Sequence, residues 1–189
     1  GCGKTTLLEA LISHQHVLNG TIKYLRPVNI GYIKQHQIDL NGELTVLEEM
    51  KKDFPSLGEK EIHNHLGKFN FDYDDSNKLV KYLSGGEKTR LVLSKIMLEN
   101  YDLLYLDEPT LGLDVISRRE LWKLILKLKK TMTIVLTTHY LEEVEALADN
   151  IGIIKDGNLI FEGKLDNLYQ ITNENNIENA FIKISGGEI

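Results

Sequence analysis

The residues that could do chemistry are concentrated in two short segments near the middle of the chain. One is Leu83-Ser84-Gly85-Gly86-Glu87, and the other is an apolar run over residues 103–106 that ends in Asp107-Glu108-Pro109. The first offers backbone amides and a hydroxyl to a phosphate at the start of a helix. The second has the form of a buried strand that delivers two carboxylates to its end. Together they indicate a nucleotide site.

A capped helix is the plain alternative for the first segment. Ser84 and Glu87 match the S-x-x-E capping box that marks helix starts. The cap does not explain the two consecutive glycines, Gly85 and Gly86, which expose their amides without a side chain in the way. We therefore expect residues 84–87 to bind a phosphate.

The two carboxylates at 107–108 have a surface turn as their plain alternative, favoured by Pro109. Loops at the carboxyl ends of strands are where open α/β sheets bind ligands, and these carboxylates directly follow four apolar residues. We expect Asp107 to hold Mg²⁺, a hard cation that prefers oxygen ligands, and Glu108 to polarise an attacking water.

The chain opens on the second half of a phosphate-binding loop. A full loop has the pattern G-x-x-x-x-G-K-[ST] after a strand, and here Gly3, Lys4 and Thr5 supply only its last glycine, lysine and hydroxyl. A chance helix cap stays open as an alternative. Since the sequence starts at Gly1 rather than Met, we expect it to be a fragment with an impaired loop.

Two further polar residues follow expected strands. His139 comes after an apolar run at 133–137 and could contact the γ-phosphate, although a lone histidine is more often structural. Gln35 comes after a strand expected at 29–33 and could touch both a metal and a partner. The pairs His14/His16 and His63/His65 have a spacing that places their side chains on different helix faces, so we interpret neither as a metal site.

Hydrophobic periodicity predicts the elements that position these residues. Helical patterns occupy residues 7–12, 86–99, 117–130 and 140–148, and strand patterns occupy 21–24, 29–33, 103–106 and 133–137. Strands that alternate with helices predict an α/β fold with a mainly parallel sheet and flanking helices.

Two other parts of the chain depart from that alternation. Residues 45–82 show short helical patterns broken by turn signals, which predicts a small helical subdomain. Residues 151–155 and 158–162 are apolar runs around Asp156-Gly157, a pair typical of a type I′ hairpin. A C-terminal tail over 165–189 follows, with a polar stretch at 173–178 and a short docked helix expected at 180–184.

The composition is that of a soluble globular domain, with 42% hydrophobic and 26% charged residues among 189. A net charge of −6 argues against nucleic-acid binding by charge alone. The single cysteine, Cys2, cannot form an internal disulfide. No apolar stretch is long enough to predict a membrane span, so we expect a single domain over residues 1–189 that meets a membrane only through a partner.

In this order and context, the motifs resemble those of the ATP-binding cassette (ABC) family of P-loop NTPases, and the resemblance covers essentially the whole chain. It implies ATP and Mg²⁺ as ligands, with Thr5, Gln35 and Asp107 at the metal. It makes Glu108 the catalytic glutamate and His139 the switch histidine. The residues that it implies for nucleotide binding are Gly1, Cys2, Gly3, Lys4, Thr5, Thr6, Gln35, Ser84, Gly85, Gly86, Glu87 and Asp114, the last from the D-loop.

The same resemblance implies partners. Two cassettes of the family face head to tail, so that each signature, here residues 84–87, completes the ATP site of the other. A transmembrane permease subunit would place the cassette in the cytoplasm, on the inner face of the cell membrane. A chain that binds nucleotide without hydrolysing it is a third class of function that the incomplete loop leaves open.

The two halves of the chain resemble different subfamilies. Residues 29–100 are most similar to F-type cassettes, which act on ribosomes, and residues 110–184 to ATPase subunits of drug and antibiotic exporters. F-type proteins usually have Asn-His at Leu111-Gly112 and Asp-Arg at Tyr140-Leu141. This chain departs from the F-type residues at both sites. Because these sites face the partner cassette and differ between the subfamilies, we give the second half more weight and favour the exporter, with the F-type cassette as the alternative. A junction of two genes near 107–110 is also open.

Overall fold

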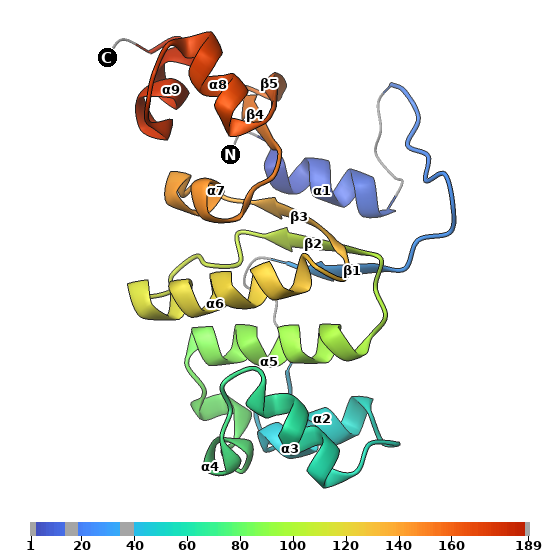
Figure 1. Cartoon of the computed structure of the whole chain (residues 1–189). Helices are drawn as coiled ribbons and strands as arrows, with labels where there is room; N and C mark the ends of the chain where they lie inside the picture. Colours follow the sequence, from blue (N-terminus) through green and yellow to red (C-terminus); the bar gives the residue numbers. More distant parts are fainter. Residues whose placement is uncertain (1–2, 14–18, 35–39, 188–189) are drawn as a thin grey trace. The chain divides into compact units, whose positions relative to one another are not determined.

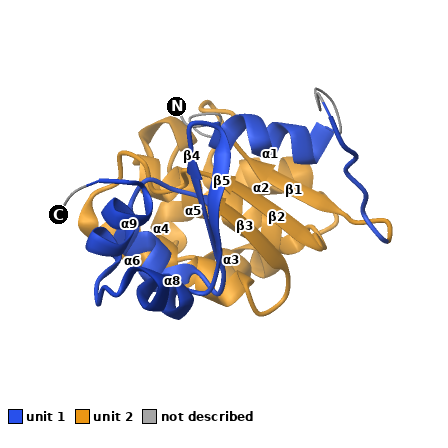
Figure 2. Ribbon diagram, turned by 90° about the horizontal axis from the view of Figure 1, so that it is seen from above, with its two compact units in different colours: residues 1–25, 137–189 blue, residues 26–136 orange. Residues whose placement is uncertain are grey.

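The computed structural model describes residues 3–13, 19–34 and 40–187. The chain divides into two compact units, one made of residues 1–25 and 137–189 and the other of residues 26–136 (Figure 2).

The sheet of the second unit carries the acidic motif. Its strands are β1 (Ile30–Ile33), β2 (Leu103–Asp107) and β3 (Thr133–Thr137), in the order β1-β2-β3 (Figure 1). β1 and β2 are parallel, with Ile30 opposite Leu103 and Ile33 opposite Leu106. The four residues before Glu108 in β2 are buried, as a central strand covered on its faces requires. The predicted α/β fold with a parallel sheet is confirmed.

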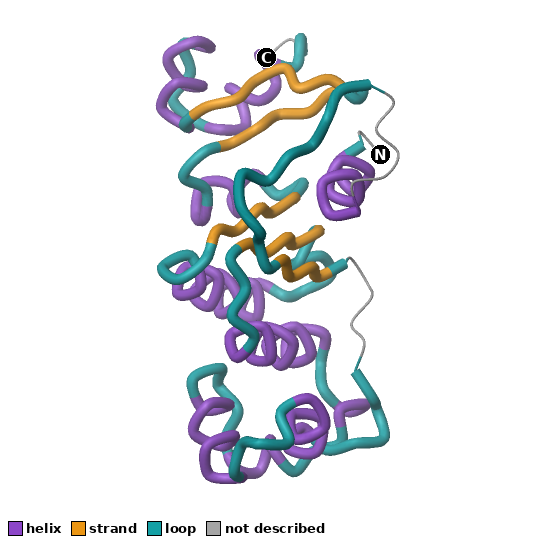
Figure 3. Tube along the Cα trace, turned by 90° about the vertical axis from the view of Figure 1, so that its right-hand side faces the viewer, coloured by secondary structure: helices purple, strands orange, loops and turns teal. Residues whose placement is uncertain are grey.

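Two long helices lie beside this sheet. α6 (Val115–Leu128) lies next to the strands, and α5 (Gly85–Leu98) packs against α6, as the views in Figures 1 and 3 agree. The side chains of α6 that point into the core follow the helical period i, i+3, i+4, i+7 and are Leu121, Leu124, Ile125 and Leu128. Both helices begin within two residues of the predicted starts.

The segment between β1 and α5 contains short helices. They are α2 (Val46–Asp53), α3 (Glu59–Gly67), α4 (Tyr73–Ser76) and the 3₁₀ turn η1 (Val80–Tyr82). An antiparallel bridge between Thr45 and Leu79 ties the start of this segment to its end. The core of these helices includes Met50, Ile62 and Leu66, which are fully buried.

The first unit contains an antiparallel hairpin covered by two helices. β4 (Ile151–Lys155) pairs with β5 (Asn158–Gly163), and the turn residues Asp156 and Gly157 have φ values of 49° and 76°. Positive φ at both positions is what a type I′ turn requires, so the predicted hairpin is confirmed. Its buried core joins the hairpin to α8 (Leu165–Thr172) and α9 (Ile177–Ile184), through Ile153, Phe161, Leu168 and Ala180. The unit also contains α1 (Lys4–Ser13) and α7 (Leu141–Leu147).

The strand predicted over residues 21–24 is wrong. These residues have no regular secondary structure, although their side chains alternate between exposed and partly buried. A strand needs a neighbour for its backbone hydrogen bonds, and no strand of the described residues pairs with this segment. The structure also contains α8, a helix within the C-terminal tail that the sequence pattern does not predict. None of the helices in the described ranges is long and apolar enough to cross a membrane.

Candidate nucleotide site

The end of β2 places the two predicted carboxylates in different environments. Asp107 closes the strand and is 1% exposed, whereas Glu108 is partly exposed in the following turn. Glu108 has a φ of 48°, in the left-handed region, and its carbonyl accepts a hydrogen bond from Leu111 N–H at 3.1 Å. This conformation costs a non-glycine residue roughly 1–2 kcal/mol, and such strain tends to occur at functional sites.

The signature segment begins α5 through a closed capping box. Ser84 N–H donates to Glu87 Oε2 at 2.7 Å, and Glu87 N–H donates to Ser84 Oγ at 3.2 Å. The amides of Gly85 and Gly86, in the first turn, have no acceptor inside the helix. The helix start therefore retains two glycine amides for a ligand.

Gly86 has a second role that its sequence context did not reveal. A Cβ atom at this position would lie 3.0 Å from Ser117 Cβ of α6, and one at Gly85 would lie 3.6 Å from Leu113 Cδ2. The double glycine thus lets the start of α5 approach the start of α6 closely. The approach brings the signature and the segment before Asp114 together within one unit.

Asp114 is the N-cap of α6. Its Oδ1 accepts from Ile116 N–H at 2.9 Å and Ser117 N–H at 3.0 Å, and Ser117 Oγ–H donates to Oδ2 at 2.6 Å. The hydroxyl and amide of Ser117, followed by the amide of Ile116, hold the pKa of the Asp114 carboxyl below its ordinary value. The structure gives this side chain a structural task besides the nucleotide contact that the resemblance implies.

The other predicted site residues, apart from Gln35, belong to the first unit. Gly3 has a φ of 96°, and its carbonyl accepts from Leu7 N–H at 2.9 Å, so that Lys4, Thr5 and Thr6 form the first turn of α1. His139 is exposed just before α7, and its ring centroid lies 4.1 Å from that of Tyr140. Gly1, Cys2 and Gln35 lie outside the described residues.

The chemistry of the donors fits Mg²⁺. Asp107 offers a buried carboxylate and Thr5 a hydroxyl, both hard oxygen ligands. No group of three or more His, Cys, Asp or Glu side chains that could hold a metal occurs in the part of the chain that the structure describes.

The histidine pair at 63/65 is integrated into the short helices. His65 Nε2 lies 2.8 Å from the carbonyl oxygen of Ser94 in α5, and burial lowers the pKa of this imidazole. His63 Nδ1 lies 3.2 Å from Ser76 Oγ, and its ring stacks on Tyr73. The two rings thus point to different neighbours.

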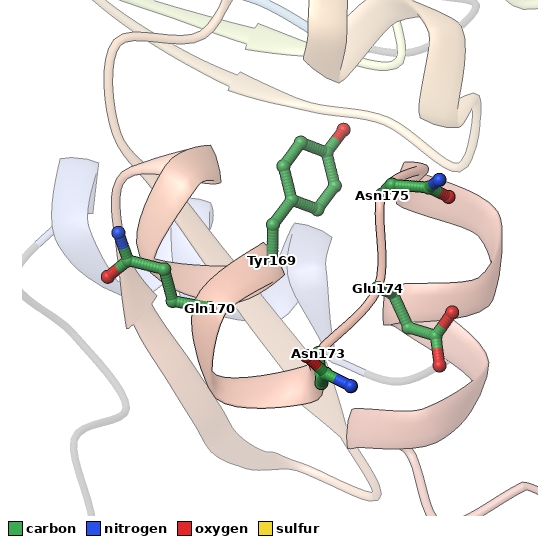
Figure 4. Close-up of a pocket in the computed structure, with 5 residues that line it drawn as sticks. All are labelled: Tyr169, Gln170, Asn173, Glu174 and Asn175. Atoms are coloured by element: carbon green, nitrogen blue, oxygen red, sulfur yellow. The ribbon is translucent and has the colours of Figure 1, made fainter.

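Two pockets among the described residues are lined by side chains other than the predicted site residues. One, of about 410 Å³, is a polar depression in the first unit lined by Tyr169, Gln170, Asn173, Glu174 and Asn175 (Figure 4). The other, of about 250 Å³, lies in the second unit, and its lining includes Ile33 and Leu40, which flank the segment of Gln35. It also includes Asp53 and Lys95, which form an ion pair.

Comparison with known proteins identifies relatives of this sequence. The family model described as ABC transporter matches residues 1–111. The ATP-binding protein YdiF of Bacillus subtilis is 43% identical over 140 residues, which are 74% of this chain and 22% of that protein. ABC transporter A family member 7 of Dictyostelium discoideum is 34% identical over an alignment of 186 positions, which covers 90% of this chain and 22% of that protein. The chain therefore spans about a fifth of the length of these relatives.

Solved structures share the fold. An ATP-binding subunit of an ABC transporter has a TM-score of 0.72 and 20% identity, with 97% of this chain and 84% of that chain covered. A dimeric post-hydrolysis state of an ATP-binding cassette bound to ADP and Pi has a TM-score of 0.65 and 23% identity, with 87% and 81% covered. The family match over more than half of the residues, together with this fold, shows that the chain belongs to the ABC transporter family as an ATPase domain.

Proposed function

We propose that the chain binds and hydrolyses ATP and powers export through a separate transmembrane subunit, from the inner face of the cell membrane. The observation that carries the proposal is the end of β2, where a buried Asp107 is followed by Glu108 in a strained left-handed conformation. Such a turn delivers one carboxylate to a metal and the next to a reacting water. The family match supports ATP as the ligand.

The resemblance to the family supplies the proposed roles of the individual residues. Lys4 and the amides of Gly85 and Gly86 neutralise phosphate charge, and His139 positions the γ-phosphate. Thr5, Gln35 and Asp107 would hold Mg²⁺ together with the phosphates of ATP, and the ion would supply positive charge to the transferred phosphoryl group. Glu108 accepts a proton from the attacking water.

The proposed partners are a second cassette and a permease. The signature and Asp114 lie together at the starts of α5 and α6, which gives one surface for the ATP site of a facing cassette. The hollow of about 250 Å³ whose lining includes Ile33 and Leu40 is the proposed docking place of the membrane subunit. We also propose residues 45–82 as the helical subdomain of the cassette and 165–189 as its C-terminal tail.

An F-type cassette that acts on the ribosome is the second candidate function. The similarity of residues 29–100 to F-type cassettes favours it. The ATP-binding protein YheS of Haemophilus influenzae is 38% identical over 136 residues. The A-family transporter of Dictyostelium discoideum is less identical than YdiF, at 34% against 43%, but it covers 90% of this chain against 74%. The genes beside the complete reading frame separate the two: a permease gene supports the exporter, and a second cassette in the same frame supports the F-type protein.

Replacement of the proposed general base tests the catalytic assignment. In the purified protein encoded by the full reading frame, Glu108→Gln should reduce steady-state ATP hydrolysis by roughly 10²–10⁴-fold and leave Mg-ATP binding in place. Glu162→Gln, on the exposed side of β5, is the matched control and should leave hydrolysis unchanged. Hydrolysis by Glu108→Gln at the wild-type rate would exclude the assignment.

A further inference from the structure

The carboxylate of the signature is bound to the signature's own backbone. Glu87 Oε2 accepts from Ser84 N–H at 2.7 Å, and this hydrogen bond fixes the carboxylate at the first turn of α5. The same box occurs at the start of α2, where Thr45 N–H donates to Glu48 Oε2 at 2.8 Å and Glu48 N–H to Thr45 Oγ1 at 3.2 Å. Only the first of these two boxes lies at a proposed phosphate site.

The negative charge of Glu87 therefore occupies the helix end that would otherwise attract a phosphate. The partial positive charge of a helix N-terminus stabilises an anion there, and a carboxylate in the first turn already uses this stabilisation. The box also takes up the amides of Ser84 and Glu87, so that the glycine amides are left for the ligand. An incoming phosphate meets both fewer donors and a like charge.

Two cations near Glu87 are paired with other carboxylates. Lys78 interacts electrostatically with Glu87, but its pKa is raised first by the hydrogen bond and charge of Asp75, with which it pairs. Arg90, one turn after Glu87, pairs with Glu120 of α6 at 2.5 Å. Each of these two cations has a carboxylate partner of its own.

We propose that Glu87 sets an upper limit on how tightly the signature holds the phosphate of ATP, so that a closed pair of cassettes reopens readily. This inference rests on the proposed function, because it needs ATP at a site that the signature completes. A glutamine at this position would keep an amide oxygen as acceptor for Ser84 N–H and remove the charge. This one substitution therefore tests the effect of the charge while it keeps the capping hydrogen bond.

The experiment measures ATP-dependent association of the purified protein. All variants carry Glu108→Gln to slow hydrolysis, and dimerisation is followed by sedimentation velocity at increasing Mg-ATP. Glu87→Gln should lower the ATP concentration at half-maximal association about fivefold at low salt. The gain should shrink at high ionic strength, where exposed charges are screened.

The matched control is Glu48→Gln, which neutralises the equivalent carboxylate of α2. It should leave the ATP dependence of association unchanged, and both variants should keep the apo melting temperature of their parent. An equal gain in both variants would reduce the effect to net charge and overturn the inference.

Two further outcomes separate the inference from the proposed function. Association of the parent protein with ATP, but no gain in Glu87→Gln at low salt, overturns the inference alone. A parent protein that neither binds nor associates with Mg-ATP overturns the proposed function, and the inference with it.

Discussion

Lys95 should be one of the most sensitive positions for the stability of the second unit. Its ammonium group lies 2.7 Å from Glu49 Oε1 and also pairs with Asp53, so that it joins α5 to α2. The Glu49 side chain is fully buried, at 0% exposure, and that of Lys95 is 13% exposed. Burial alone would lower the pKa of Lys95, but the hydrogen bonds and charges of Asp53 and Glu49 outweigh it and raise the pKa.

Lys95→Met leaves the Glu49 carboxylate buried without its nearest cation. Removing one partner of a buried ion pair typically costs 3–5 kcal/mol, because the remaining charge is uncompensated. Glu49 keeps Lys52 at 3.7 Å and the amide of Asn41 at 3.3 Å, which moderates the loss. We therefore expect the free energy of unfolding to fall by about 3 kcal/mol, the lower end of that range.

Urea denaturation, followed by the fluorescence of Trp122 in α6, measures this loss. Adding Glu49→Gln to Lys95→Met should recover about 2 kcal/mol, since the uncompensated charge is then gone. Lys81→Met is the matched control: it breaks a surface pair with Glu43, at 3.0 Å, and should cost less than about 1 kcal/mol. Equal costs for Lys95→Met and Lys81→Met, or no recovery in the double variant, would refute the reasoning.

Three further predictions test other parts of the structure. Because burial lowers the pKa of His65, the unfolded chain binds more protons here than the folded one below the ordinary histidine pKa. The free energy of unfolding should therefore fall as the pH is lowered from 7 to 5, and His65→Gln should reduce that dependence; an unchanged pH profile would contradict it. Gly157→Ala should cost about 1 kcal/mol at a φ of 76°, whereas Gly67→Ala, with open space around it, should cost nothing in urea titrations. Gly86→Ala should lower the melting temperature more than Gly85→Ala, since only the former meets Ser117 at 3.0 Å; the reverse order would show that α5 and α6 are not closely packed there.

The sequence predicted those parts of the fold that depend on neighbours within a few residues. The capping box at Ser84, the period of α6 and the Asp156-Gly157 turn each involve groups separated by no more than one or two helical turns. Their hydrogen bonds and apolar stripes are local, so residue types at fixed spacing are sufficient to predict them. The same kind of local pattern identified the signature at residues 84–87 and the two carboxylates at residues 107–108.

The tertiary structure decided what distant residues do to one another. Glu49 and Lys95 are 46 positions apart in the sequence. Position 86 requires a glycine only because α6 passes close to it. The alternation at residues 21–24 has the local form of a strand, yet a strand forms only where another supplies hydrogen-bond partners. Glu108 likewise has a left-handed backbone conformation in the turn after β2, and no residue pattern predicted it. Spacing thus determined which groups could act, and packing decided their conformation, burial and charge environment.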